Sequence, residues 1–302
     1  MTTPAPSHIP VLLDPIRAAA QGARRVVDAT LGHGGHAEMF LGLGAEVLGI
    51  DRDPEALAIA RARLGAGLQT LEAPYASDEG LAAVQAFAPE FILLDLGVSS
   101  RQLDDDTRGF TFRPGAALDM RMGREGPSGA DLLNEAEEET LADIFHFWGD
   151  ERKARQLARA IVRRRANAPF VVSDDFVNAI RSVLGPRSGP GDFARLFQSL
   201  RIAVNDELEG LERALPAFLD ALRPGGHLAV IGYHSGEDRV AKQLFQEWAR
   251  SCICPPEQPI CTCRGKPLGV LVPRKPIVPD AAEVAANPRA RSAKLRIFRK
   301  AE

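Results

Sequence analysis

The sequence predicts an α/β fold in which a parallel sheet is interrupted by an inserted all-helical domain. Short apolar runs alternate with helical segments between residues 26 and 95, and a further apolar run begins at residue 227. Between these two parts, residues 128–200 carry helical patterns with no strand-like run among them. Such alternation is typical of a parallel sheet covered on both faces, whose ligands bind at the carboxyl ends of the strands.

A glycine-rich turn joins the first two predicted strands. The apolar run at Val26 ends in Asp28, glycines follow at Gly34 and Gly35, and the second run closes on Asp51. Glycines let a ligand approach the backbone at a helix N-terminus, and an acid at the tip of the next strand can accept two ribose hydroxyls. The stretch predicts a nucleoside cofactor, although an ordinary glycine-rich turn has a similar local sequence.

The turn departs from the dinucleotide-binding fingerprint, because the position of the third glycine holds Ala37. Its first acid, Asp28, also precedes the glycines instead of following them. This order resembles the first motif of S-adenosylmethionine methyltransferases, whose ligand carries no pyrophosphate.

Two further strands are predicted at residues 68–71 and 91–95, and the second of these ends in Asp95. The periodicity is then lost, since residues 96–122 follow neither a strand nor a helix pattern and are rich in charges. Long aperiodic loops are usually functional or disordered, and the aromatic rings of Phe110 and Phe112 favour function. We interpret this stretch as an active-site segment.

The rest of the chain divides between helices and the last strands. Helices are expected at residues 130–147, 151–165, 173–184 (after a candidate N-cap at Ser173), 193–204, onward to 222, and 236–250. Strands are expected at residues 227–233 and 294–298. The predicted sheet domain is therefore discontinuous, with residues 1–110 and 205–302, and the inserted helical domain covers residues 111–204.

Positive charge is concentrated locally on a mildly acidic chain. The whole sequence has 37 basic and 40 acidic residues, a net charge of −3, which argues against nucleic-acid binding over the entire surface. The helix at 151–165 nevertheless holds seven basic residues, among them Arg163, Arg164 and Arg165, and residues 287–300 hold six. Two basic patches indicate a polyanionic substrate. For the helix at 151–165 taken alone, a solvated charged face is the alternative.

All four cysteines lie in one short segment, as Cys252-Ile253-Cys254 and Cys261-Thr262-Cys263. Structural zinc sites usually separate the two cysteines of a pair by two to four residues instead of one, so no metal is expected here. The N-terminus lacks a signal sequence, and no apolar run approaches the roughly 20 residues that cross a bilayer. We therefore expect a cytoplasmic protein with reduced cysteines.

A second polar cluster, Tyr233-His234-Ser235-Gly236-Glu237-Asp238-Arg239, follows the strand predicted at 227–233. Catalytic groups of parallel sheets collect at this end of a strand, which makes His234 a candidate. Ser235 could instead cap the following helix, with Asp238 as its acidic partner in the first turn.

Long stretches of the chain resemble the bacterial 16S ribosomal RNA (cytosine-N4)-methyltransferase family. The stretches are DATLGHGGHAE, IDRDPEAL, LLDLGVSSRQLDDDTRGFTFRPGAALDMRM, RLFQSLRIAVNDEL, YHSGEDR and NPRARSAKLR. The resemblance implies a Rossmann-like class I methyltransferase sheet, S-adenosylmethionine as cofactor, and a cytosine of the decoding region (P site) as target. The implied partner is 16S ribosomal RNA in the small subunit or an assembly intermediate, with the enzyme a monomer or homodimer.

The resemblance also implies roles for individual residues. Cofactor contacts fall on Gly34, Gly35, His36, Asp51, Tyr75, Asp95 and Gln102. For catalysis we expect Asp95 and His234 to act on the cytosine amine and Phe110 or Phe112 to stack on a flipped base, with Asp95 as a pure cofactor ligand nearly as well supported. For RNA binding we expect Arg163, Arg164 and Arg165. A non-catalytic RNA-binding protein with a retained nucleoside-binding fold is the main alternative, and a nicotinamide oxidoreductase is a second.

Overall fold

The computed structural model describes residues 10–255, 257–258, 260 and 262–302, and divides the chain into two compact units. The first unit comprises Met1–Gly97 and Leu208–Glu302, and the second is Val98–Glu207. Of the two boundaries predicted from the sequence, the one at residue 110 falls inside the second unit. The one at residue 204 falls near the end of that unit. No helix in the described part of the chain is long and apolar enough to cross a membrane.

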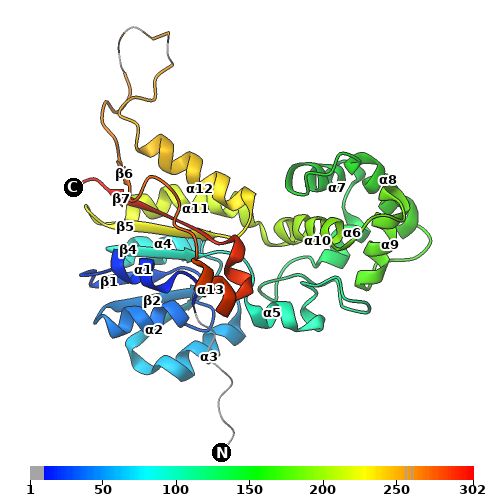
Figure 1. Cartoon of the computed structure of the whole chain (residues 1–302), viewed down its shortest axis with the longest axis horizontal. Coiled ribbons are helices and arrows are strands. Elements are labelled where there is room, and N and C mark those ends of the chain that lie inside the picture. The colour runs from blue at the N-terminus through cyan, green and yellow to red at the C-terminus, as the bar shows by residue number, and fades with distance from the viewer. Residues whose placement is uncertain (1–9, 256, 259, 261) are drawn as a thin grey trace, which may run out of the picture. The chain divides into compact units, whose positions relative to one another are not determined.

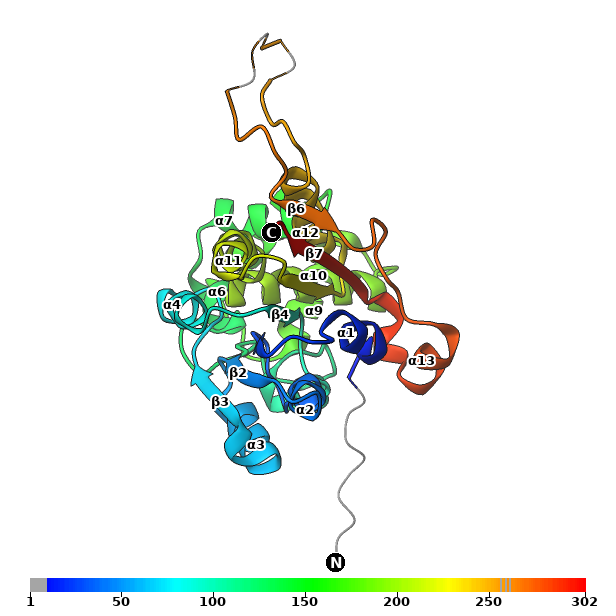
Figure 2. The same ribbon diagram turned by 90° about the vertical axis from the view of Figure 1, so that its left-hand side faces the viewer.

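The first unit is built on a seven-stranded sheet with the order β3-β2-β1-β4-β5-β7-β6 (Figures 1 and 2). The strands are β1 (Arg25–Asp28), β2 (Glu46–Asp51), β3 (Leu68–Glu72), β4 (Phe91–Asp95), β5 (His227–Gly232), β6 (Gly269–Leu271) and β7 (Lys294–Lys300). The first five strands pair in parallel, while β7 is antiparallel to both β5 and β6. The predicted α/β class is confirmed, and the order is that of a class I methyltransferase sheet.

Helices cover both faces of this sheet, as Figure 2 shows for α1 and α2 on one side and α4 and α11 on the other. The helices of the unit are α1 (Leu13–Ala19), α2 (Gly35–Gly42), α3 (Pro54–Leu64), α4 (Asp78–Phe87), α11 (Glu207–Ala221), α12 (Ser235–Trp248) and α13 (Ala281–Ala286). Alternate strand residues such as Val26, Val47 and Phe91 pack with Ile16 and Phe40 in one core cluster. Successive side chains of a strand point to opposite faces of the sheet, and helices cover both faces. The parallel strands therefore read as continuous apolar runs.

The chain crosses from one half of the sheet to the other between β1 and β4. From β1 it runs outward through β2 to β3, and then returns to β4 on the other side of β1. The carboxyl ends of β1, β2 and β4 carry Asp28, Asp51 and Asp95, and parallel pairing places all three at one edge of the sheet. Ligands of open α/β sheets bind at this edge, next to the point where the strand order reverses.

The second unit is helical. Its elements are α5 (Ser100–Asp104), η2 (Asp106–Arg108), α6 (Gly129–Glu135), α7 (Glu138–Asp143), η3 (Ile144–Trp148), α8 (Ala154–Arg165), α9 (Ser173–Leu184) and α10 (Pro190–Asn205). They share a core that includes Leu133, Phe145, Leu157, Phe176 and Leu200. The only bridge of strand type among the described residues of this unit joins Ala117 to Val172.

Several sequence-based boundaries are wrong in this unit. The helix predicted at 130–147 is two helices, because the chain turns to extended backbone at Ala136 and Glu137. The segment 96–122 contains the short elements α5 and η2. Ser173 is the first residue of α9 instead of its cap, and its hydroxyl donates to the carbonyl of Arg113, while Asp175 accepts the backbone N–H groups that precede the helix.

Candidate active site

The glycine turn after β1 is shaped by two positions that exclude a side chain. Gly34 has a left-handed backbone with φ of 78°, and a Cβ atom there would come within 2.7 Å of Leu64. A Cβ atom on Gly35, the first residue of α2, would meet Pro10 at 2.7 Å. Left-handed backbone and close packing both favour glycine, so the turn keeps its backbone accessible at the start of a helix.

Asp51 connects the tip of β2 to this turn. Its Oδ2 accepts the N–H of Gly32 at 2.7 Å, and its Oδ1 accepts the N–H of Asp53 at 2.9 Å. Burial raises the pKa of Asp51 above its ordinary value, while those two backbone bonds oppose the rise. A carboxylate has about four lone-pair sites, so both oxygens can still accept a hydroxyl. The carboxylate is thus held in a fixed position with capacity for ribose.

Asp28 and Asp95 end the two strands between which the chain crosses the sheet. Asp28 is fully buried, and its Oδ1 accepts the N–H of Thr30 at 3.4 Å. Burial raises the pKa of Asp28 from 3.8 to about 7, with nearby His36 opposing the rise and Asp95 adding to it. The negative charge of Asp95 adds to the effect of burial and favours the protonated form of Asp28.

Asp95 is held by groups from three separate segments. Tyr233, which follows β5, donates its hydroxyl hydrogen bond to Asp95 Oδ1 at 2.8 Å, and Thr30 Oγ1 accepts the Asp95 N–H at 2.6 Å. His36 Nδ1 lies 3.7 Å from Asp95 Oδ2, while His36 Nε2 is 3.0 Å from the carbonyl of Val11. A carbonyl can only accept, so Nε2 carries a proton. The Asp95 carboxyl remains about a quarter exposed, which leaves it accessible to a ligand.

His234 caps a helix. It is the N-cap of α12, its Nδ1 accepts the N–H of Gly236 at 3.2 Å, and Glu237 Oε2 accepts the His234 N–H in return. The cap is therefore one residue earlier than the predicted Ser235, and the predicted partner Asp238 binds Arg296 at 2.7 Å instead. Since the lone pair of Nδ1 is occupied, Nε2 carries a proton, and it lies 3.2 Å from Glu237 Oε1.

Tyr75, the predicted stacking residue, follows β3 and is almost fully buried. Its ring lies 6.3 Å from that of Phe218 on α11, in a tilted arrangement. Gly80 permits this loop to turn tightly, because a Cβ atom there would come within 2.5 Å of the carbonyl of Pro74. The ring is therefore packed in place before any ligand arrives.

The predicted site residues of the second unit make local contacts within that unit. Gln102 Oε1 accepts the N–H of Ser99 at 2.9 Å. Phe110 and Phe112 are partly buried against the helical core, where the ring of Phe112 meets Phe193 and Phe197 edge-on, with centroids 6.0 Å away in each case. Core packing explains both rings, and their stacking on a base stays a prediction.

The arginines at the end of α8 differ in their surroundings. Arg164 donates to Asp175 at 2.6 Å and lies over the ring of Phe170, and Arg165 donates to the carbonyls of Leu133 and Ala136. Arg163 is exposed. Two of the three predicted RNA ligands thus hold their own unit together. The exposed basic side chains of α8 are those of Arg155, Arg159 and Arg163, and Arg152 and Lys153 are exposed just before the helix.

Comparison with known proteins decides the family. The family model of the MraW methylase family matches residues 5–301. The chain belongs to the MraW methylase family. It is 54% identical to the ribosomal RNA small subunit methyltransferase H of Gemmatimonas aurantiaca, covering 97% of this chain and 95% of the relative, and 44% identical to that of Heliobacterium modesticaldum, covering 97% and 98%. Membership makes it a methyltransferase whose cofactor is S-adenosylmethionine.

A solved structure of an rRNA methylase from Streptococcus thermophilus also aligns, over 96% of this chain and 93% of that chain. Its TM-score is 0.39 and its identity 12%, values too low to support a conclusion about the MraW chain.

Two residues of this MraW methylase site are not predicted from the sequence. Tyr233 stands in the recognised stretch YHSGEDR, but its role depends on pairing between β4 and β5, which lie more than 130 residues apart in the chain. Thr30 contributes a hydroxyl that only the folded turn brings to Asp95. The acid at Asp28 stands in the recognised stretch, but its burial becomes apparent only in the folded sheet.

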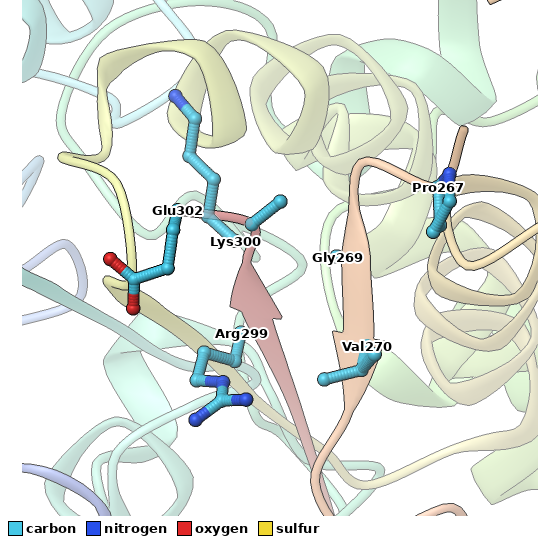
Figure 3. Close-up of a pocket in the computed structure, with 7 residues that line it drawn as sticks. Pro267, Gly269, Val270, Arg299, Lys300 and Glu302 are labelled. Carbon is cyan, nitrogen blue, oxygen red and sulfur yellow. The ribbon is translucent and has the colours of Figure 1, made fainter. Parts of the chain in front are cut away.

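A pocket of about 120 Å³ lies elsewhere on the same unit (Figure 3). It is lined by Pro267, Gly269, Val270, Arg299, Lys300, Ala301 and Glu302. Arg299 pairs with His227, the first residue of β5, so the pocket is at the amino end of the parallel strands. The three acids are at the carboxyl end, and the MraW methylase site is therefore on the opposite edge of the sheet.

Proposed function

We propose that this methyltransferase transfers a methyl group to N4 of a cytosine in the decoding region (P site) of 16S ribosomal RNA. The names of its relatives support ribosomal RNA of the small subunit as the substrate, and the motif resemblance supports the cytosine amine. The observation that carries the chemistry is the carboxyl of Asp95, which the Tyr233 hydroxyl holds at the edge where the strand order reverses, while Thr30 accepts the backbone N–H of Asp95. The substrate is the RNA in the small subunit or in an assembly intermediate.

The residues that would hold the cofactor fit its chemical groups. Asp51 has acceptor capacity for the ribose hydroxyls, and Gly34 and Gly35 keep the backbone of the turn open to a ligand. Tyr75 supplies an aromatic surface near the tip of β3, and Gln102 is assigned by resemblance. When bound, S-adenosylmethionine supplies a methyl group activated by a positively charged sulfonium. The acids Asp28 and Asp95 give this edge the negative charge that favours such a cation.

The chain's own contribution to the reaction is positioning and proton acceptance. The amine of cytosine is a weak nucleophile, because its lone pair is delocalised into the ring. A hydrogen bond from the amine to Asp95 draws nitrogen toward tetrahedral geometry and makes the lone pair available. As the N–C bond forms and the S–C bond breaks, the amine becomes positively charged, and it then gives up one proton. We assign Asp95 as the acceptor of this proton, because Nδ1 of His234 already accepts the N–H of Gly236.

Two substitutions at Asp95 test this assignment. Asp95→Ala should lower the single-turnover rate at saturating cofactor by about 10² or more, on the scale of one positioned polar group. Asp95→Asn should give an intermediate rate. The substrate is the small subunit from cells that lack the gene, and mass mapping of its nucleotides gives the modified position. A full rate for Asp95→Ala at saturating cofactor would make Asp95 a binding residue only, and a methyl group elsewhere than cytosine N4 would refute the proposed target.

A further inference from the structure

The segment between α12 and β6 carries cysteines and has no helix or strand among its described residues. It covers residues 249–268, and Figure 1 shows it in orange, extending away from the sheet beyond α12 and β6. Its apolar side chains contribute nothing to the core, since Ile253 and Ile260 are both exposed. A loop of this length without a core needs some other source of order.

Three sulfur atoms meet in this segment. The Sγ atoms of Cys252, Cys254 and Cys263 all lie within 4.8 Å of one another, and those of Cys252 and Cys263 are 3.8 Å apart. A separation of 3.8 Å is far longer than the roughly 2.05 Å of a disulfide bond. In a tetrahedron with Zn–S bonds of about 2.3 Å, neighbouring sulfurs are about 3.8 Å apart. The Cys252–Cys263 separation equals that of two thiolates on one zinc ion, and Cys254 Sγ lies within 4.8 Å of both.

The one-residue spacing within each cysteine pair has a physical explanation. In extended backbone, side chains two residues apart point to the same side, so Cys252 and Cys254 can face a common partner. The chain folds back and brings Cys263 to that side.

Backbone N–H groups point at these sulfurs. Ile253 donates to Cys263 Sγ at 3.4 Å, and the backbone of Thr262 and Cys263 donates to Cys254. Hydrogen bonds of this kind stabilise a thiolate, the form that binds a metal.

The base of the segment is closed by separate contacts. The side chain of Arg264 donates to the carbonyls of Glu247 and Arg250 and to that of Lys266, and the N–H of Leu268 donates to the carbonyl of Trp248 at 2.8 Å. Arg264 thereby ties the end of α12 to the start of β6. These contacts hold the two ends of the segment together, and the sulfur cluster joins its two sides further along the loop.

We propose that Cys252, Cys254 and Cys263 bind one Zn²⁺ ion that orders residues 249–268. The three thiols lose their protons to solvent as three Zn–S bonds form, and a fourth donor completes the tetrahedron. The fourth cysteine of the sequence, Cys261, lies outside the described residues. The site is structural. Its loop leads into β6, which begins at the amino end of the parallel strands, whereas the three acids lie at the carboxyl end. The proposal reverses the expectation drawn from spacing alone.

The test uses the full chain, reduced with a phosphine, stripped with a chelator and titrated with Zn²⁺ against a chromophoric competitor. Wild type should bind about one zinc per chain, and Co²⁺ in its place should give thiolate-to-metal charge-transfer absorption. Cys263→Ser and Cys254→Ser should each weaken zinc binding by roughly tenfold or more. Ser251→Ala, in the same exposed segment, should bind as wild type does. Far-ultraviolet circular dichroism checks that each variant remains folded.

A second readout follows the order of the loop. Trypsin can cut after Arg250 and Arg264, and zinc should slow these cuts in wild type but not in Cys263→Ser. The proposal is overturned if wild type and Cys263→Ser bind zinc equally, or if zinc leaves the cleavage rate unchanged. Methyl transfer is not needed for either measurement, so failure here is distinguishable from failure of the proposed function.

Discussion

Replacing Asp28 with asparagine should change how the stability of this methyltransferase depends on pH. Asp28 is 1% exposed, and burial raises its pKa from 3.8 to about 7. Between these two values the folded protein keeps a proton that the unfolded chain has released. The free energy of unfolding therefore falls as pH rises through this window and levels off above the folded-state pKa.

The size of the effect follows from the width of the window. Between pH 5 and the folded-state pKa of about 7 lie about two pH units, and each is worth about 1.4 kcal/mol, so from pH 5 to pH 8 wild type loses roughly 3 kcal/mol that Asp28→Asn does not lose. The asparagine side chain has the shape of the protonated acid and no charge. The variant should thus gain on wild type as pH rises, with the larger advantage at pH 8.

Urea unfolding at pH 5 and pH 8 measures this difference, with a probe in the first unit such as the fluorescence of Trp248. Asp143→Asn is the matched control, because the same substitution on an exposed helix position removes no buried carboxyl. If the stability difference between Asp28→Asn and wild type is the same at both pH values, the carboxyl does not titrate between them and the reasoning from burial is refuted.

Four further substitutions test the site and the RNA-binding surface. Asp51→Ala should weaken S-adenosylmethionine binding by roughly 1.5 to 3 kcal/mol in a calorimetric titration, because it removes the acceptor for the ribose, and an unchanged dissociation constant would exclude Asp51. Tyr233→Phe should slow single-turnover methylation, and combining it with Asp95→Asn should add less than the two separate effects, since both act on one hydrogen bond. Arg163→Gln should lower RNA affinity and reduce the salt slope by about one, whereas Arg164→Gln should lower thermal stability by removing the Asp175 pair; equal effects of the two on RNA affinity would contradict this division.

Much of the sheet can be predicted from sequence because its signals are local. The strands that end in Asp28, Asp51 and Asp95 are apolar runs followed by acids, and the folded chain has them at those positions. The strand Gly269–Leu271 is not predicted, since three residues carry no readable period and its formation depends on pairing with β7. The ends of helices are hard to predict because their local signals can be absent. The break at Ala136, for example, has no glycine or proline to mark it.

The roles of side chains are harder to predict than the elements that carry them. A run of arginines indicates a basic surface, but the sequence does not distinguish the exposed Arg163 from Arg164, which packs on Phe170. An isolated histidine at a strand end indicates catalysis, yet His234 spends its lone pair on the first turn of α12. In both cases the role of the side chain depends on a contact made within the fold. That contact cannot be read from the residue's type or from its position along the chain.

The contacts around Asp95 determine what its asparagine variant can report. Tyr233 donates to one oxygen, so the amide oxygen of asparagine can take that place. Asp95→Asn can therefore keep the bond to Tyr233 and lose only the negative charge. A slow Asp95→Asn enzyme with normal stability would assign the rate to charge at this carboxyl, and a slow Asp95→Ala enzyme beside a fast Asp95→Asn enzyme would assign it to hydrogen-bond geometry.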